Sequence, residues 1–184
     1  KGSEPLKVNE IRKAIYQSST LKLIDSYVQQ YSGSGVYRTV FTDNDIKRYE
    51  DYGRFFRSIA FYVRYDDKHK KVKNYNSRPR DMINTVLAEI QSGSIILSPD
   101  KVTHIIEQTM QLLLFFSSEQ SKDYLVDACL YFSIEYPNSF EKIKGSIASD
   151  KTILDTLLKS ASTTSNVNER FSRISEMVHG VAND

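Results

Sequence analysis

The sequence predicts an all-α fold, a single-domain bundle of about seven or eight helices. Three observations support this: apolar residues recur at helical spacing along most of the chain, helix-capping signals precede several of these stretches, and short polar turns separate them. A chain of 184 residues, 40% of them hydrophobic, is long enough to bury one large core. Strand signals are weak, so we expect at most one minor strand, near residues 36–41.

The first helical pattern extends from Val8 to Tyr31, as one long helix or as two short helices with a break at residues 18–20. Two glycines at positions 33 and 35 end this pattern, because glycine has large backbone freedom and no side chain to pack. Residues 35–41 alternate weakly, and we favour an extended connector there over a strand, since no partner strand is evident.

A long helix is predicted to begin at the capping pair Thr42 and Asp45 and to continue to Val63. Its apolar side is unusually broad and aromatic. The range from Tyr37 to Tyr75 holds ten of the 21 aromatic residues in the chain. Such a side is typical of a central helix that several others contact, so most of these rings should be core.

Further helices are predicted after position 78. The run Ser98-Pro99-Asp100 is the strongest start signal, with a capping hydroxyl, a proline at the first helical position and an acid near the positive end of the helix dipole. The expected helices cover approximately residues 79–92, 98–116, 117–136, 139–147, 150–161 and 167–180. We expect the polar run 160–166 to be a mobile linker. Within one domain, 1–184, the parts 1–63 and 79–184 would be joined by a basic loop, 64–80.

Catalytic and metal-binding signatures are missing from the sequence. There is no glycine-rich phosphate loop, no nucleophile elbow and no cysteine pair with metal spacing. His104 and Glu107 fit a solvated helix face, and Asp43 with Asp45 fits helix capping better than a calcium loop. We therefore expect no enzyme, no catalytic residues, no metal and no cofactor. A hydrolase with two carboxylates is the alternative, because such sites assemble from distant residues.

The segment 64–80 is the most distinctive part of the chain. It contains seven Lys or Arg residues and two Asp, although the whole chain has a net charge of only +2. Lysine and arginine neutralise phosphates, and tyrosine rings can stack on unpaired bases. The predicted contact residues, for nucleic acid or an acidic partner, are Arg64, Tyr65, Lys68, Lys70, Lys71, Lys73, Tyr75, Arg78 and Arg80.

The functional hypothesis is a non-catalytic helical binding module, or a subunit of a larger assembly, that contacts RNA or another single strand through this loop. Two alternatives remain open: the loop is only a solvated connection, or the chain is an effector or regulatory protein that docks on another protein through the aromatic helix. The expected partners are another protein or a multisubunit assembly, and RNA. No small-molecule ligand is expected.

The sequence also indicates a cellular setting. The single cysteine, Cys129, has apolar neighbours and is expected in the core. No glycosylation sequon occurs, and no apolar run approaches the roughly 20 residues that a membrane-spanning helix needs. We expect an intracellular, cytoplasmic protein, in a cell or an infected host, with no membrane segment.

Overall fold

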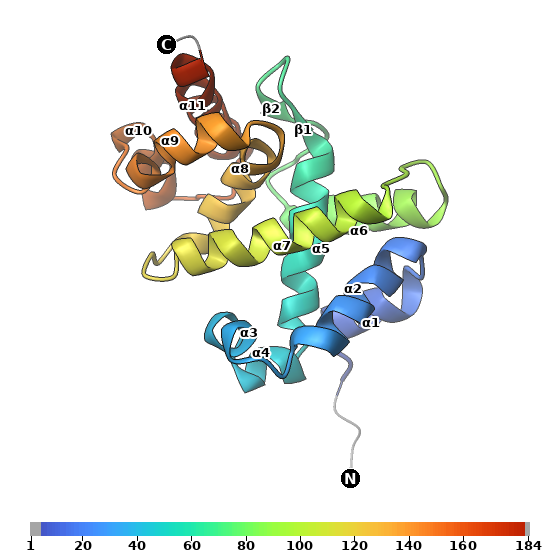
Figure 1. The fold of residues 1–184 in the computed structure, drawn as a ribbon. Coiled ribbons are helices and arrows are strands. Elements are labelled where there is room, and N and C mark those ends of the chain that lie inside the picture. Colours follow the sequence, from blue (N-terminus) through green and yellow to red (C-terminus); the bar gives the residue numbers. More distant parts are fainter. Residues whose placement is uncertain (1–4, 183–184) are drawn as a thin grey trace.

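Residues 5–182, the part that the computed structural model describes, form eleven helices and one short β-hairpin (Figure 1). The predicted all-α class is confirmed, but the predicted count of seven or eight helices was too low. In chain order the elements are α1 (Val8–Ile15), α2 (Ser19–Tyr31), α3 (Gly35–Val40), α4 (Asp43–Lys47), α5 (Glu50–Arg64), β1 (Tyr65–Asp66), β2 (Lys71–Val72), α6 (Pro79–Gln91), α7 (Pro99–Phe115), α8 (Lys122–Glu135), α9 (Pro137–Ile147), α10 (Lys151–Leu158) and α11 (Thr164–Ala182).

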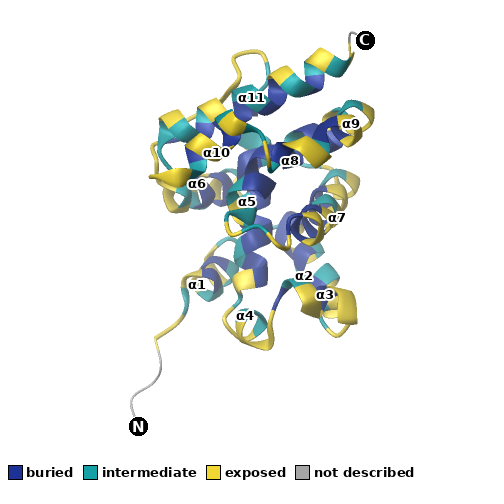
Figure 2. Ribbon diagram, turned by 90° about the vertical axis from the view of Figure 1, so that its left-hand side faces the viewer, coloured by how far each residue is buried: buried dark blue, intermediate teal, exposed yellow. Residues whose placement is uncertain are grey.

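Helix α5 runs through the middle of the molecule and contacts α1, α4, α6, α7 and α8 (Figure 1). Its aromatic side is buried, with Phe55, Phe56 and Phe61 at most 1% exposed. Figure 2 shows the same arrangement by colour, with α5 largely buried and the outer helices exposed on their outward sides. The prediction that the aromatic stripe marks a central helix is therefore confirmed.

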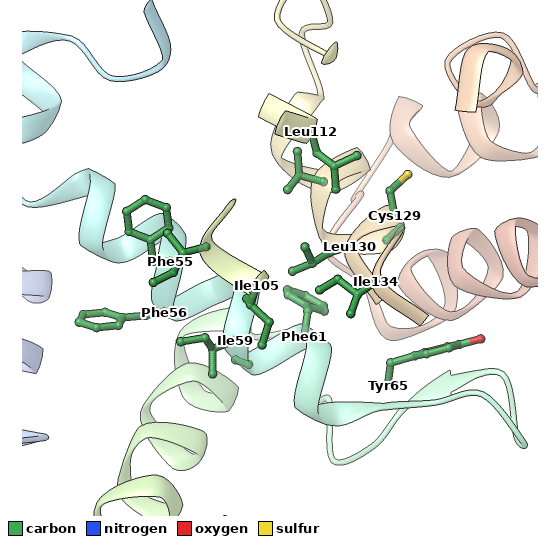
Figure 3. Packing of buried hydrophobic residues seen from close by; sticks show 14 of the residues in the cluster. Phe55, Phe56, Ile59, Phe61, Tyr65, Ile105, Leu112, Cys129, Leu130 and Ile134 are labelled. Atoms are coloured by element: carbon green, nitrogen blue, oxygen red, sulfur yellow. The ribbon is translucent and has the colours of Figure 1, made fainter. Parts of the chain in front are cut away.

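The core forms where α5, α7 and α8 meet. Phe55, Ile59 and Phe61 of α5 lie close to Ile105 of α7 and Leu130 of α8, and all five are at most 1% exposed (Figure 3). Each such side chain contributes roughly 1.5–3 kcal/mol through burial, so this meeting point provides much of the stability that holds the helices together.

Residues 36–41 are neither the strand nor the connector that the alternation suggested, because α3 occupies residues 35–40. The hydroxyl of Ser34 accepts a hydrogen bond from the backbone N–H of Tyr37 and caps this helix. The Tyr37 ring is 1% exposed, and its hydroxyl donates to Asp51 on α5 at 2.6 Å. Tertiary burial of Tyr37 thus fixes a helix too short to show a helical period in the sequence.

The long helix predicted from Thr42 is interrupted at Tyr49, whose backbone φ of 58° is left-handed and cannot continue a right-handed helix. The cap itself is confirmed, since Thr42 accepts from the N–H of Asp45 and the Asp45 carboxylate accepts from the N–H of Thr42 at 2.8 Å. The result is two helices, α4 and α5, in place of one.

Two helix starts in the second half of the chain agree with the prediction, and others are displaced. The Ser98 hydroxyl caps α7 and the Asp150 carboxylate caps α10, as expected. Helix α9 begins at Pro137, earlier than the predicted Ser139, since proline suits the first helical position. In the segment 160–166, the carbonyl of Ala161 accepts from the buried guanidinium of Arg170 at 2.8 Å, and α11 already begins at Thr164.

Candidate functional site

The basic segment 64–80 folds into a β-hairpin followed by an extended stretch that leads into α6. Tyr65 lies opposite Val72 in the antiparallel pair, and the two side chains are only 6% and 3% exposed. The backbone N–H of Val72 donates to the side chain of Asn168 on α11 at 2.9 Å. One face of the hairpin is therefore fixed to the helical body, which the prediction of an exposed loop did not include.

Asp67, directly after β1, attaches the hairpin to the C-terminal helices. Its carboxylate accepts hydrogen bonds from the hydroxyls of Tyr136, at 2.7 Å, and Ser175, at 3.3 Å. The same carboxylate lies 3.3 Å from Nε2 of His179. The hydrogen bond to Asp67 raises the pKa of Tyr136 to about 12. Asp67, one of the two acids of the segment, therefore holds the hairpin to the helices and forms no ion pair with the exposed lysines of the hairpin.

The two tyrosines expected to stack on bases are core residues. The Tyr65 ring stacks on Phe171 at 4.8 Å between centroids. Tyr75 is 6% exposed, and its hydroxyl donates to the backbone carbonyl of Ser162 at 2.5 Å. Burial raises the pKa of Tyr75 to about 12. Neither ring presents a face to solvent, so the expectation of base stacking on Tyr65 and Tyr75 has to be corrected.

Three of the cations in the segment lie near acids of the same chain. Arg64 pairs with Glu89 at 2.6 Å, and Lys73 pairs with Asp66 at 2.9 Å. Arg78 lies 3.9 Å from Asp81, with 74% of its side chain exposed, which is a weak contact. Hydrogen bonds from His69 and Lys73 lower the pKa of Asp66, so that carboxylate is ionised at neutral pH.

The remaining hairpin cations are Lys68, Lys70 and Lys71, at the turn and the start of β2. All three are exposed, and none forms an ion pair with any residue from 5 to 182. We call these three unpaired lysines of the hairpin the lysine turn.

Apart from Arg80, a second set of cations was missed by sequence reasoning. They line a cavity of about 670 Å³ at the start of α1, α5, α6 and α8. Because these residues come from separate elements, no local pattern in the sequence could signal the cavity. The cationic residues of its wall are Arg12, Arg48, Arg54, Arg57, Arg80 and Lys122. Arg80, predicted as part of the basic loop surface, is exposed and lies at this wall.

Two of the cavity arginines are neutralised by a buried acid. Asp127, 3% exposed, accepts from Arg54 and Arg57, with the closest N to O distance 2.5 Å in each pair. Burial alone would raise the pKa of Asp127, but the charges of Arg57 and Arg54 and their hydrogen bonds hold it below its ordinary value. Asp127 is therefore a carboxylate at neutral pH and ties α5 to α8.

The metal and calcium alternatives receive no support from side-chain positions. His104 and Glu107 are both exposed on α7, and Asp45 is used for helix capping. Across the described part of the chain, no three His, Cys, Asp or Glu side chains are grouped so that they could hold a metal ion.

The alternative of docking through the aromatic helix face needs exposed rings. On α5, Tyr52 is 6% exposed, and the phenylalanines of the same face are more deeply buried. Tyr62 is half-buried, and its hydroxyl donates to Glu135. The face is used to pack α5 against its neighbours and offers little surface for another protein.

Between residues 5 and 182, no helix combines the length and the apolar content that crossing a membrane would require. Comparison of the chain with protein families, with curated proteins and with solved structures finds no match.

Proposed function

We propose that this protein is a non-catalytic helical binding module that contacts the phosphate backbone of a single-stranded nucleic acid, with RNA as the first candidate, as part of a larger assembly. The observation that carries the proposal is the lysine turn, in which Lys68, Lys70 and Lys71 are exposed and form no ion pair with the described residues. Cations of this kind bind phosphates and release counterions.

The fixed hairpin supports this proposal. Tyr65, Val72 and Asp67 hold one face of the hairpin against the C-terminal helices, so the three lysines project from a defined backbone. Fixing the backbone before binding lowers the entropy lost on association. With both tyrosines buried, the contact would involve phosphates only, and binding would be insensitive to sequence.

The test is a fluorescence anisotropy titration of labelled single-stranded RNA at several salt concentrations. The triple variant Lys68→Glu, Lys70→Glu, Lys71→Glu should bind at least tenfold more weakly at low salt. Three lost phosphate contacts should also reduce the slope of log K against log salt by about 2. Lys73 is left intact because it pairs with Asp66 within the hairpin.

The matched control is Lys22→Glu, Lys142→Glu, Lys159→Glu, which changes the net charge equally at exposed lysines outside the hairpin. This control should keep most of the affinity and slope, and both variants should keep the wild-type circular dichroism spectrum. Absence of salt-sensitive binding by the wild type, or equal losses in both variants, would overturn the proposal. Binding of an acidic protein through the same lysines would then be the next candidate.

A further inference from the structure

The cavity at the start of α1, α5, α6 and α8 holds more positive charge than its own acids neutralise. Arg54 and Arg57 pair with Asp127, as described above. By contrast, Arg48, Arg80 and Lys122 form no ion pair with any described residue. Three acids lie in the wall: Asp123 pairs with Arg54, Asp45 caps α4, and Glu50 accepts a hydrogen bond from the side chain of Asn9. With Asp127, these four carboxylates face six cations, which leaves a formal excess of two positive charges. The wall therefore retains unbalanced cations.

Arg12 is the most informative of these cations. It is 6% exposed, yet its guanidinium has only neutral partners: the side-chain oxygens of Asn84, at 2.8 Å, and Asn9, at 2.9 Å, and the backbone carbonyl of Arg80. Desolvation by burial, and then the nearby charge of Arg80, lower the pKa of Arg12, and the opposing charge of Glu50 does not offset them. A buried charge that forms no ion pair destabilises the fold, and an anion bound in the cavity would reduce that cost.

The backbone adds to the attraction for an anion. Residues of the first turn of four helices lie in the wall, including Asn9 of α1, Glu50 of α5, Arg80 of α6 and Asp123 of α8. Helix N-termini carry partial positive charge and free N–H groups, which is why phosphates bind there. In the same wall, the buried Nε of Arg54 donates to no acceptor.

The size and the remaining lining indicate an organic ligand in addition to the anion. A volume of about 670 Å³ falls within the range of ~300–1,000 Å³ typical of small-molecule sites. The apolar part of the wall, which could contact the organic part of a ligand, includes Val8, Val40, Phe41, Pro79, Ile83 and Leu113.

We propose that this cavity binds a phosphomonoester of nucleotide size, with the phosphate between Arg12, Arg48 and Arg80 and the organic part against the apolar wall. The inference does not depend on the lysine turn. The two sites lie toward opposite ends of α5, whose 15 residues span about 22 Å. This proposal differs from the sequence-based expectation that the protein binds no small molecule. The cavity could not be foreseen there, because its residues come from separate elements that meet only in the folded chain.

Isothermal titration with adenosine 5′-monophosphate as the probe tests the proposal, with adenosine and inorganic phosphate as comparison ligands. The monophosphate should bind, and adenosine should bind at least tenfold more weakly. Arg48→Ala and Arg80→Ala should each weaken binding about tenfold, the usual effect of losing one charge-assisted hydrogen bond. Arg78→Ala, an exposed arginine two positions away and outside the wall, is the control and should bind normally.

Both substituted arginines are exposed, so the variants should fold. Thermal unfolding without ligand checks that the variants are folded. With ligand, the monophosphate should raise the melting temperature of the wild type but not of the Arg48→Ala, Arg80→Ala double variant. A 5′-phosphorylated RNA that competes with the monophosphate would identify an RNA end as the source of the phosphate. Binding of adenosine as strong as that of the monophosphate, or no binding of any of the three probes, would overturn the proposal.

The lysine-turn variants distinguish this proposal from the proposed function. Glutamate at positions 68, 70 and 71 should leave binding of the monophosphate unchanged while it weakens binding of unphosphorylated RNA at least tenfold. Loss of monophosphate binding in that variant would contradict the cavity assignment, whereas loss of RNA binding in the Arg48→Ala, Arg80→Ala variant alone would contradict the lysine-turn assignment.

Discussion

At the scale of single residues, Asp127 is the best-defined electrostatic element of the molecule. It is 3% exposed and lies between the guanidinium groups of Arg54 and Arg57. Arg57 also packs over the ring of Tyr124. Removing one partner of a buried ion pair lowers the stability of the fold by more than the intact pair contributes to it. The reason is that the remaining charge stays buried without a counter-charge.

Asp127→Asn should lower the free energy of unfolding by about 3–5 kcal/mol, since two guanidinium groups lose their counter-charge. Urea denaturation at pH 7 measures this. Asp123→Asn is the control: Asp123 contacts the same Arg54, but 56% of its side chain is exposed, and the expected loss is at most about 1 kcal/mol. If both variants lost a similar free energy of unfolding, burial of the carboxylate would not be what makes Asp127 important for stability.

The same pair gives a pH dependence. The pKa of Asp127 is lower in the folded than in the unfolded protein, so its stabilisation is fully present above the unfolded pKa of about 3.9 and disappears as the pH falls toward the folded value. Part of the wild-type loss of stability below about pH 4 should therefore be absent in Asp127→Asn. A parallel acid profile in the two proteins would contradict this assignment.

At the scale of elements, local signals predicted some helix starts correctly, but α8 begins at Lys122 where residue 117 was predicted, and α11 at Thr164 where residue 167 was predicted. A cap needs only neighbouring residues, so Ser98 and Asp150 could be recognised from the sequence. Helix α3, with six residues, and α4, with five, are shorter than the window in which a helical period can be seen. Their conformation depends on the burial of Tyr37 and the left-handed backbone at Tyr49, which are tertiary effects.

For the candidate sites too, some features could be predicted from the sequence and others depend on the folded chain. The excess of lysine in the segment 64–80 is visible in the sequence, but whether each cation is paired depends on distant acids such as Glu89. Burial of Tyr65 and Tyr75 also depends on packing against α11 and the segment before it. The cavity arginines lie in separate elements, so only the folded chain brings them together.

The contact between α1 and α5 depends on the absence of a side chain at Gly53. A Cβ there would clash with the Asn9 side chain, with Cγ only 2.8 Å away. Asn9 in turn orients Arg12 at 2.9 Å. We expect Gly53→Ala to reduce the stability by about 1–3 kcal/mol through overpacking, and to weaken monophosphate binding.

Gly145→Ala on α9 is the matched control for that substitution. No atom lies within 4 Å of a Cβ built at Gly145, so alanine should stabilise the helix by about 0.5–1 kcal/mol. Urea denaturation of the two variants should therefore give changes of opposite sign. A stabilising Gly53→Ala would contradict the packing of α1 against α5.

At the scale of the whole molecule, α5 separates two positively charged features. Its beginning, near Glu50, lies at the arginine-lined cavity, and its end, at Arg64, leads into the hairpin with the lysine turn (Figure 1). The core around α5 lies between the two features, which therefore occupy different parts of the molecule.

The central claim is that the lysine turn contacts nucleic acid, and the most direct measurement is a titration of ¹⁵N-labelled protein with an unphosphorylated single-stranded RNA, followed by amide chemical shifts. We predict that the largest shifts fall on residues 68–71 and disappear at high salt, while the amides of α9 and α10 stay unchanged. Shifts centred elsewhere, or no salt-sensitive shifts at residues 68–71, would contradict the account.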